Sequence, residues 1–129
     1  MKTIYVLVVV DTAGALASRS AIDNAYLVDT NGFLGSWQEG TPVLHTVCED
    51  GDLVCWTVIP IASTGDVSIA GFSGAMLEQG VCRPTLQSSD GNPWLARVES
   101  RGQFVAFSYV LTLAVGGVQL SLNAQIKVI

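Results

Sequence analysis

Two apolar-rich runs of equal length, 104–115 and 118–129, flank the dipeptide Gly116-Gly117. Glycine readily adopts the positive φ angles of a two-residue hairpin turn, so this dipeptide predicts a tight turn between two antiparallel strands. With the turn placed here, one face of the hairpin pairs only apolar residues: Val115 with Val118, Leu113 with Leu120, Leu111 with Leu122, Tyr109 with Ala124, and Phe107 with Ile126. The other face pairs Thr112 with Ser121, Val110 with Asn123, Ser108 with Gln125, and Ala106 with Lys127. A shift of one residue would exchange the two faces, so turn and pattern indicate the same register.

Other short segments have the composition of strands and are separated by turn residues. In the run 4–10 the residues Ile4, Val6, Val8 and Val10 alternate with Tyr5, Leu7 and Val9, as in a buried strand. A second hairpin is expected at Asp50-Gly51, with Cys48 opposite Leu53, Thr46 opposite Cys55, and His45 opposite Trp56. Further strands are expected at 25–29, 67–72 and 95–100, and residues 14–22 have room for one helical turn. About seven short strands predict one all-β domain over residues 1–129, an antiparallel two-layer β-sandwich of Ig-like or jelly-roll topology.

The composition narrows the possible partners. Of the 129 residues 50 % are hydrophobic and 13 % are charged, with a formal net charge of −5. Lysine and arginine are not clustered, and no apolar run approaches the roughly 20 residues of a membrane span, so neither a nucleic acid nor a membrane span is expected. With so few charges, several strands must have apolar residues on both faces; the first strand does, and Leu44, Leu53 and Ile59 extend the outward side of the second hairpin. Because a monomer seldom exposes large apolar patches, we expect a homo-oligomer, a twofold dimer.

Cysteine content and the first residues bear on the compartment. Cys48, Cys55 and Cys82 are an odd number, and on the expected hairpin Cys48 and Cys55 lie too far apart for a disulfide, so free thiols in the cytoplasm are expected. Lys2, the run 4–10 and Ala15-Leu16-Ala17 imitate a short secretory signal, but Asp11 interrupts it. Any release from the cell would then follow a leaderless route.

The sequence offers little for catalysis. His45 is the single histidine, and we expect it to pack in or near the core with a hydrogen-bonded neighbour rather than to act in a reaction. The segment 71–74, GFSG, resembles a nucleophile elbow, but Ala75 occupies the place of the second glycine and no helix is expected to follow. We therefore expect no catalytic residues and no enzymatic activity.

Two acidic segments resemble cation sites in part. The segment 29–32, DTNG, begins like a calcium loop, but Phe33 and Leu34 occupy the next positions, so a turn closed by the Asp29 side chain is the favoured interpretation. Glu49, Asp50 and Asp52 are expected at a solvated hairpin tip. Neither a metal nor a cofactor is expected.

Long loops carry the candidate ligand-binding residues. The connections 11–24, 31–42 and 83–93 exceed ordinary hairpin length, and such loops are often functional. In them Trp37 lies beside Gln38 and Glu39, and Trp94 follows Asn92, so each tryptophan has polar neighbours. Such a ring is either a flat platform for a sugar, with polar side chains reaching the hydroxyls, or a lid over one end of the sandwich. If two of these loops gather at one end, that end is the expected site for a glycan or another host-surface ligand.

Several segments together resemble the PixA/AidA family of bacterial inclusion-body and nematocidal proteins. They are VVVDT at 8–12, YLVDTNG at 26–32, GSWQEG at 35–40, LHTVC at 44–48, GFSG at 71–74, GVC at 80–82 and RVESRG at 97–102. The resemblance implies a non-enzymatic bacterial accessory protein without established catalytic residues. AidA members are associated with quorum-sensing control and with the killing of nematodes, and PixA members accumulate as intracellular inclusions.

The AidA branch is the better match within this family. PixA is rich in methionine, whereas Met1 and Met76 are the only methionines of this chain. The resemblance therefore implies an AidA-type protein linked to host interaction. The alternative function is a small lectin-like module that binds a carbohydrate or another ligand.

Overall fold

The structure is a computed structural model that describes residues 1–32 and 35–129. The described residues form nine strands and two short helices: β1 (Thr3–Val10), α1 (Thr12–Ser18), β2 (Ala25–Asp29), β3 (His45–Cys48), β4 (Leu53–Pro60), β5 (Val67–Ser73), α2 (Ala75–Glu78), β6 (Thr85–Leu86), β7 (Trp94–Arg97), β8 (Ala106–Val115) and β9 (Val118–Val128). Within these described ranges, no helix is long and apolar enough to cross a membrane.

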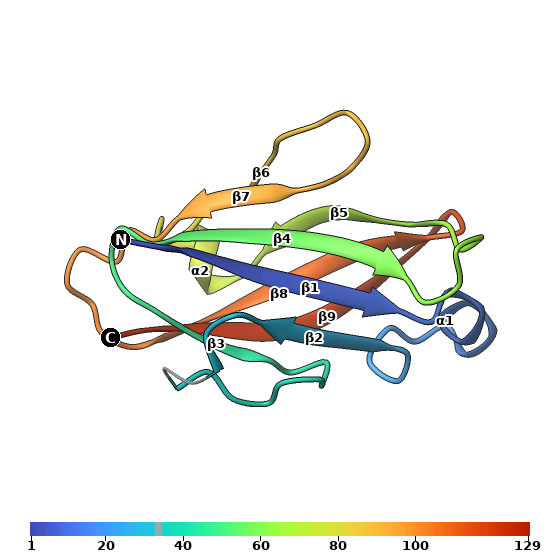
Figure 1. The fold of residues 1–129 in the computed structure, drawn as a ribbon, viewed down its shortest axis with the longest axis horizontal. Helices are drawn as coiled ribbons and strands as arrows, with labels where there is room; N and C mark the ends of the chain where they lie inside the picture. Colours follow the sequence, from blue (N-terminus) through green and yellow to red (C-terminus); the bar gives the residue numbers. More distant parts are fainter. Residues whose placement is uncertain (33–34) are drawn as a thin grey trace.

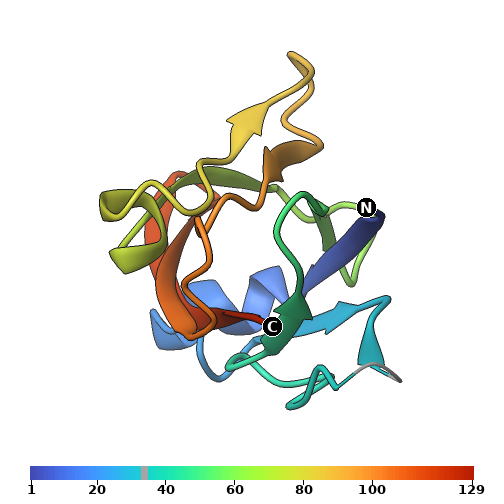
Figure 2. The same cartoon turned by 90° about the vertical axis from the view of Figure 1, so that its left-hand side faces the viewer.

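The strands form two sheets that pack face to face. The first sheet has five strands in the order β2-β1-β4-β7-β6, and the second has four in the order β3-β9-β8-β5. Figure 2 shows the two layers along the strands, with β8 and β9 (orange and red) on one side and β1 (dark blue) on the other. The predicted single-domain, two-layer β-sandwich is thus confirmed. Both sheets are mixed, because β1 pairs with β4 and β3 pairs with β9 in parallel, while the other neighbours pair in antiparallel fashion as expected.

The C-terminal hairpin has the register that its sequence predicts. Val115 pairs with Val118, Leu111 with Leu122, and Phe107 with Ile126, with Gly116 and Gly117 at φ angles of 54° and 84° in the turn. Its inward residues fill the core from the side of the second sheet: Phe107, Tyr109, Leu111, Leu113, Val115, Leu122, Ala124, Ile126 and Val128. The strand β8 begins at Ala106, two residues later than expected.

The expected first strand is also confirmed, as β1 at the centre of the first sheet. Its inward residues Ile4, Val6, Val8 and Val10 are at most 2 % exposed. Strand β2 has the expected bounds, and β5 and β7 lie close to the expected segments 67–72 and 95–100. The single helical turn expected within 14–22 is a seven-residue helix, α1, that begins earlier because the Asp11 side chain accepts a hydrogen bond from the Gly14 amide at 3.1 Å.

The second hairpin was predicted wrongly. Strands β3 and β4 belong to different sheets, and residues 49–52 cross between them (Figure 1). The crossover is anchored to the first strand, because the Asp52 carboxylate, 3 % exposed, accepts hydrogen bonds from the amides of Lys2 and Glu49, each at 3.0 Å. The Asp50-Gly51 dipeptide therefore marks a turn, but its two flanking strands pair with distant segments instead of with each other.

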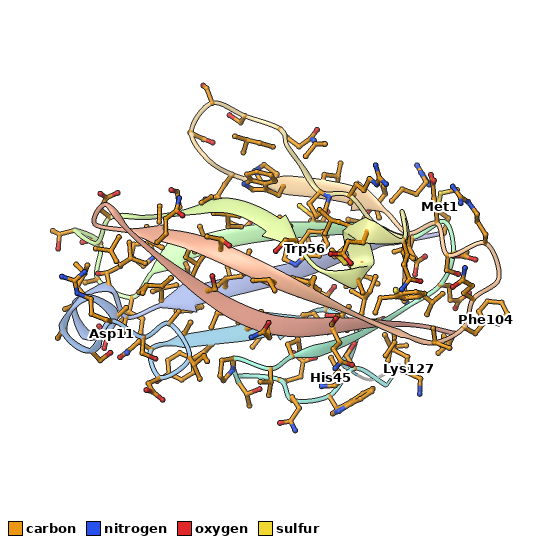
Figure 3. All side chains as sticks on the ribbon, turned by 180° about the vertical axis from the view of Figure 1, so that it is seen from behind. Met1, Asp11, His45, Trp56, Phe104 and Lys127 are labelled. Carbon is orange, nitrogen blue, oxygen red and sulfur yellow. The ribbon has the colours of Figure 1, made fainter. Side chains whose placement is uncertain are left out.

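Aromatic side chains join the two sheets in the core. Trp56 of β4 and Tyr109 of β8 are fully buried, and the Trp56 indole N–H donates a hydrogen bond to the Tyr109 hydroxyl at 3.3 Å. Phe72 of β5 packs edge-on against Trp56 with ring centroids 4.9 Å apart. Burial raises the pKa of Tyr109, so its hydroxyl stays neutral. The hydrogen bond from Trp56 takes the place of the hydrogen bond that this hydroxyl would make with water. Figure 3 shows Trp56 between the layers.

Candidate functional site

The outward side of the first sheet has no charged side chain on β2, β1 and β4, and Leu95 of β7 continues it up to Arg97, which lies outward opposite Leu53. Strand β1 turns Tyr5, Leu7 and Val9 outward, and its neighbours continue the same rows in register. We call this surface the apolar face; it consists of Tyr5, Leu7, Val9, Tyr26, Val28, Cys55, Thr57, Ile59 and Leu95. In Figure 1 it turns toward the viewer, and no described segment crosses in front of β1 and β4.

Several side chains of the apolar face are well exposed. The exposed fraction is 58 % for Tyr5, 44 % for Tyr26, 40 % for Ile59 and 37 % for Val28. Singly exposed apolar residues are common on soluble proteins, but these residues are neighbours on adjoining strands. The pattern is therefore a continuous surface and not a set of isolated side chains.

The size of this surface fits part of a docking site. Its rows run from Tyr5 to Val9 of β1, five residues that span about 17 Å, and four strands span about 19 Å, so the footprint is roughly 300 Å². The largest apolar patch of an ordinary monomer is about 300–600 Å² and is often functional. A specific contact between two proteins needs about 500 Å² from each partner. The apolar face supplies somewhat more than half of this area, and the residues around its rim would have to supply the rest.

The sequence-based expectation for outward apolar residues is correct only in part. Leu53 and Ile59 lie on the outward side of β4, as expected. Leu44, in contrast, is fully buried in the core, because the hairpin that placed it outward does not exist.

Trp37 lies on the outward side of β3, in the loop that precedes this strand. Its backbone forms an antiparallel bridge with His45. The Trp37 amide donates to the His45 carbonyl at 3.0 Å, and the His45 amide donates to the Trp37 carbonyl at 2.9 Å. Its ring stacks on the His45 ring with centroids 4.4 Å apart, and 41 % of its surface remains exposed. The Lys127 ammonium lies 5.9 Å from the ring centroid. Trp37 therefore covers a strand of the second sheet and does not close an end of the sandwich.

The two residues after Trp37 have different environments. Gln38 is exposed, with a positive φ of 63°, while Glu39 reaches the first sheet, where its carboxylate accepts a hydrogen bond from the Asp29 amide at 2.8 Å. Partial burial is the main cause that raises the pKa of Glu39, and the neighbouring Asp29 raises it further. Glu39 is thus engaged in holding the loop. Phe33 and Leu34 of the same connection lie outside the described residues.

Trp94 and Asn92 belong to a different part of the molecule. The Trp94 ring is half-buried and packs against Phe72 with centroids 5.5 Å apart, and its indole nitrogen is buried with no hydrogen-bond partner in the part of the chain that the structure describes. The Asn92 amide group binds both backbone groups of Val58, at 3.1 Å and 3.0 Å. The loop 83–93 and the Trp37 loop project from opposite sides of the sandwich (Figure 1, Figure 2). The five candidate ligand residues are therefore not brought together.

His45 differs in detail from its expected role. It is half-buried on the outward side of β3, under Trp37, and its Nδ1 is buried without a hydrogen-bond partner among residues 1–32 and 35–129. The expected hydrogen-bonded neighbour is thus not seen at this atom. Its opposite residue is Gln125 of β9 and not Trp56.

The acidic segments serve the fold. The Asp29 carboxylate accepts a hydrogen bond from the Asn31 amide at 2.9 Å, which confirms the turn expected there. Glu49, Asp50 and Asp52 do not form a solvated hairpin tip, because Asp52 is buried and Asp50 accepts hydrogen bonds from the amides of Ser100 and Gly102. These bonds lower the pKa of Asp50. Among the residues outside 33–34, no group of three or more metal-ligating side chains lies close enough to hold a metal ion.

The remaining candidates for reactive groups are three cysteine thiols and the segment 71–74, which has only part of a nucleophile-elbow motif. Cys48, Cys55 and Cys82 are free, as expected, and burial raises the pKa of Cys48 and of Cys82 to about 12, which keeps these thiols protonated. A one-turn helix, α2, follows the segment 71–74, so the expectation of no helix there was wrong. Ala75 still occupies the position of the second glycine of a nucleophile elbow.

Two cavities lie apart from Trp37 and from the apolar face. One, of about 50 Å³, is lined by Lys2, Asn31, Val47, Cys48, Glu49, Asp52 and Ile129, and is too small for a sugar. In it the Lys2 ammonium donates to the Asn31 side chain at 2.8 Å. The other, of about 180 Å³, lies between Gly80, Cys82, Arg83, Arg97 and Glu99. Neither cavity is lined by Trp37 or by a residue of the apolar face.

Comparison with known proteins adds a family and a fold. Residues 2–121 match a family described as a domain of unknown function, DUF8788. The chain belongs to this family. No curated protein matches the sequence. Among solved structures, this DUF8788 chain is similar to the crystal structure of an inclusion body protein, PixA, from Burkholderia cenocepacia J2315, with a TM-score of 0.77 and 15 % identity over 99 % of this chain and 95 % of that one. At this identity the similarity establishes a common fold. The resemblance to the PixA/AidA family expected from the sequence is thus confirmed for the fold.

Two features of the DUF8788 chain were not found by sequence reasoning. One is the extent of the apolar face, whose members on β2 and β7 become neighbours of β1 and β4 only through the order of the strands. The other is the group formed by Trp37, His45 and Lys127, which comes from a loop and two strands far apart in the sequence. The alternation of Tyr5, Leu7 and Val9 was the one local signal for the first feature.

Proposed function

We propose that this DUF8788 protein is a non-enzymatic bacterial accessory protein of the AidA type, associated with quorum sensing and with contact between a bacterium and a nematode host. We further propose that its working form is an assembly of identical copies. The observation that carries the assembly is the apolar face, which the fold leaves uncovered. The fold shared with an inclusion body protein is a second, weaker support.

Charge favours a second copy as the occupant of the apolar face. The chain has a formal net charge of −5, so two copies repel each other at most orientations. The apolar face contributes no charged side chain, and two such faces meet without burying an ion. A twofold contact would place β1 of one copy against β1 of its partner, so that the same residues serve on both sides. Two apolar faces together contribute roughly 600 Å², less than a standard specific interface buries, which suits a weak assembly that dissociates at micromolar concentration.

Two of the four edge strands, β2 and β3, are already occupied and so disfavour edge-to-edge pairing there. At the β2 edge, the Leu27 amide donates to the Thr41 carbonyl at 3.0 Å, and the Gly40 amide donates to the Leu27 carbonyl at 2.8 Å. At the β3 edge, the bridge between Trp37 and His45 occupies the same kind of backbone groups. The edges at β2 and β3 are therefore not free to pair with a strand of another copy.

The state of the reactive groups supports a non-enzymatic role. The only imidazole is stacked under Trp37, and the fully buried thiols have strongly raised pKa values. One observation favours the alternative function, a lectin-like module: the exposed ring of Trp37. The two functions are compatible because Trp37 belongs to the second sheet and the apolar face to the first.

Sedimentation equilibrium from low to high micromolar concentration tests the assembly. We expect a mass above the 13.6 kDa of one chain that rises with concentration. Hydroxyl-radical footprinting locates the contact: Tyr5 and Tyr26 should become protected as copies associate, while Trp37 keeps its reactivity. A single-chain mass at every concentration, or protection of Trp37 without Tyr5, contradicts the proposed assembly.

Nematode survival tests the host-related part of the proposal. We expect bacteria that produce the chain to shorten the survival of nematodes feeding on them, relative to bacteria with an empty vector. Equal survival on the two strains would contradict the AidA-type role and would leave the assembly to be judged by sedimentation alone.

A further inference from the structure

Trp37 combines rigidity with exposure, a combination that a merely structural tryptophan does not need. Its backbone is fixed by two hydrogen bonds to His45, and the loop after it is closed by the Thr41 hydroxyl, which donates to the Gln38 carbonyl at 2.7 Å. One face of its ring is covered by His45, yet 41 % of the side chain is exposed. A flat side chain with one face covered and this much exposure has its second face open to solvent.

The positive charge beside the ring comes from the strand next to β3. His45 pairs with Gln125 of β9, and Lys127 follows two residues later on the same outward side. His45 and Lys127 therefore approach the ring from the sheet, and Figure 3 shows both on this side of the molecule. The Lys127 ammonium lies over the ring, 5.9 Å from its centroid, and Lys127 is an exposed residue. The acidic residue nearest in sequence, Glu39, is held by the Asp29 amide.

We infer that Trp37 and Lys127 form a binding site for a pyranose sugar that carries a carboxylate, of the uronic or sialic acid class. The apolar C–H face of the sugar ring stacks on the open face of Trp37. The carboxylate pairs with the Lys127 ammonium, and the exposed Gln38 and the outward Gln125 offer amide groups to the hydroxyls.

The fixed position of the ring reduces the cost of binding. A side chain that is already held in one orientation loses little conformational freedom when a ligand stacks on it. The site is shallow, so a single sugar should bind weakly, in the millimolar range. It does not depend on assembly, because all of its residues belong to one chain. If copies associate through the apolar face, their Trp37 sites remain free on the opposite sheet and can engage several sugars at once.

Fluorine NMR of the chain labelled with 5-fluorotryptophan tests this inference directly. The three tryptophans give one resonance each, and the Trp37→Phe variant identifies that of Trp37. On titration with methyl glucuronide, we expect a saturable shift of the Trp37 resonance, with the Trp56 and Trp94 resonances unchanged. Methyl glucoside, which lacks the carboxylate, should bind roughly fivefold more weakly.

Variants separate the two parts of the site. Lys127→Gln should weaken glucuronide binding to the level of the glucoside, while Arg83→Gln, which removes the same charge away from Trp37, should leave it unchanged. Trp37→Ala should abolish the binding of both sugars, and unchanged Trp56 and Trp94 resonances would show that the variant is folded; if it is not, Lys127→Gln still decides. The inference is overturned if the Trp37 resonance does not shift saturably, if both sugars bind equally well, or if Lys127→Gln binds glucuronide like the natural chain.

Discussion

The outward faces of the two sheets have opposite compositions. On the first sheet, Leu7 lies between Val28 and Thr57, and Val9 lies between Tyr26 and Ile59. On the second sheet, the corresponding outward pairs are Thr112 with Ser121, Val110 with Asn123, Ser108 with Gln125, and Ala106 with Lys127. Their inward faces, in contrast, are alike, since both bury almost only apolar side chains.

This difference separates what the fold requires from what it does not. A two-layer sandwich needs one apolar face on each sheet, and both inward faces meet this need. The second sheet demonstrates that the outward face of this molecule can be polar. The apolar outward face of the first sheet is therefore not a demand of folding, and the proposed assembly would bury it.

The largest predicted effect comes from a charge placed on β1 within the apolar face. Val9 is half-buried between Tyr26 and Ile59, and in a twofold contact Val9→Lys would introduce two lysines near each other. Like charges at an interface cost several kcal/mol, so we expect the dissociation constant of the assembly to rise about 1,000-fold, or about 4 kcal/mol. Sedimentation velocity measures this change.

The matched control places the same charge on the other outward face. Ser121 is exposed on β9, opposite Thr112, and Ser121→Lys should leave the dissociation constant unchanged. Circular dichroism in the near ultraviolet checks that both variants keep the packing around Trp56. If Val9→Lys associates as tightly as the natural chain, or if Ser121→Lys weakens association equally, the difference between the faces has no role in assembly.

The second prediction compares the two sides of one strand. Leu111 is fully buried opposite Leu122, whereas its neighbour Thr112 points outward opposite Ser121. Leu111→Ala should lower the free energy of unfolding by about 3 kcal/mol, because it leaves a cavity in the core. Thr112→Ala should change it by less than about 0.5 kcal/mol. Urea denaturation at one protein concentration measures both, and effects of similar size would contradict the assigned register.

The two hairpin predictions show why part of the fold could be predicted from the sequence. The β8–β9 pairing is local, because Gly116-Gly117 joins strands whose side-chain patterns match residue by residue. Asp50-Gly51 is an equally good local turn signal, but β4 pairs with β1, about fifty residues earlier, and β3 with the far end of β9. Parallel pairing involves no turn that could fix its register, so a single sequence carries no local signal for it.

The same limit applies to the candidate sites. The platform and lid alternatives for Trp37 and Trp94 could both be formulated from neighbouring residues, but the partners of each ring come from elsewhere. His45 reaches Trp37 through a backbone bridge, Lys127 arrives from β9, and Phe72 meets Trp94 across the two sheets. Outward apolar residues were predictable on β1 from alternation alone, whereas the width of the apolar face follows from the strand order.

The smallest predicted effect concerns the crossover that joins the two sheets. Hydrogen bonds from Ser100 and Gly102 lower the pKa of Asp50 in the folded state below its ordinary value of 3.8. A lowered carboxyl pKa stabilises the fold above 3.8, and this stabilisation is lost as the pH falls through the folded-state pKa. Asp50→Asn keeps one acceptor oxygen but no charge, so we expect a slightly lower melting temperature at neutral pH and no difference in strong acid. Thermal unfolding across this pH range measures the effect; a difference that persists in strong acid would mean that the crossover depends on the shape of Asp50 and not on its charge.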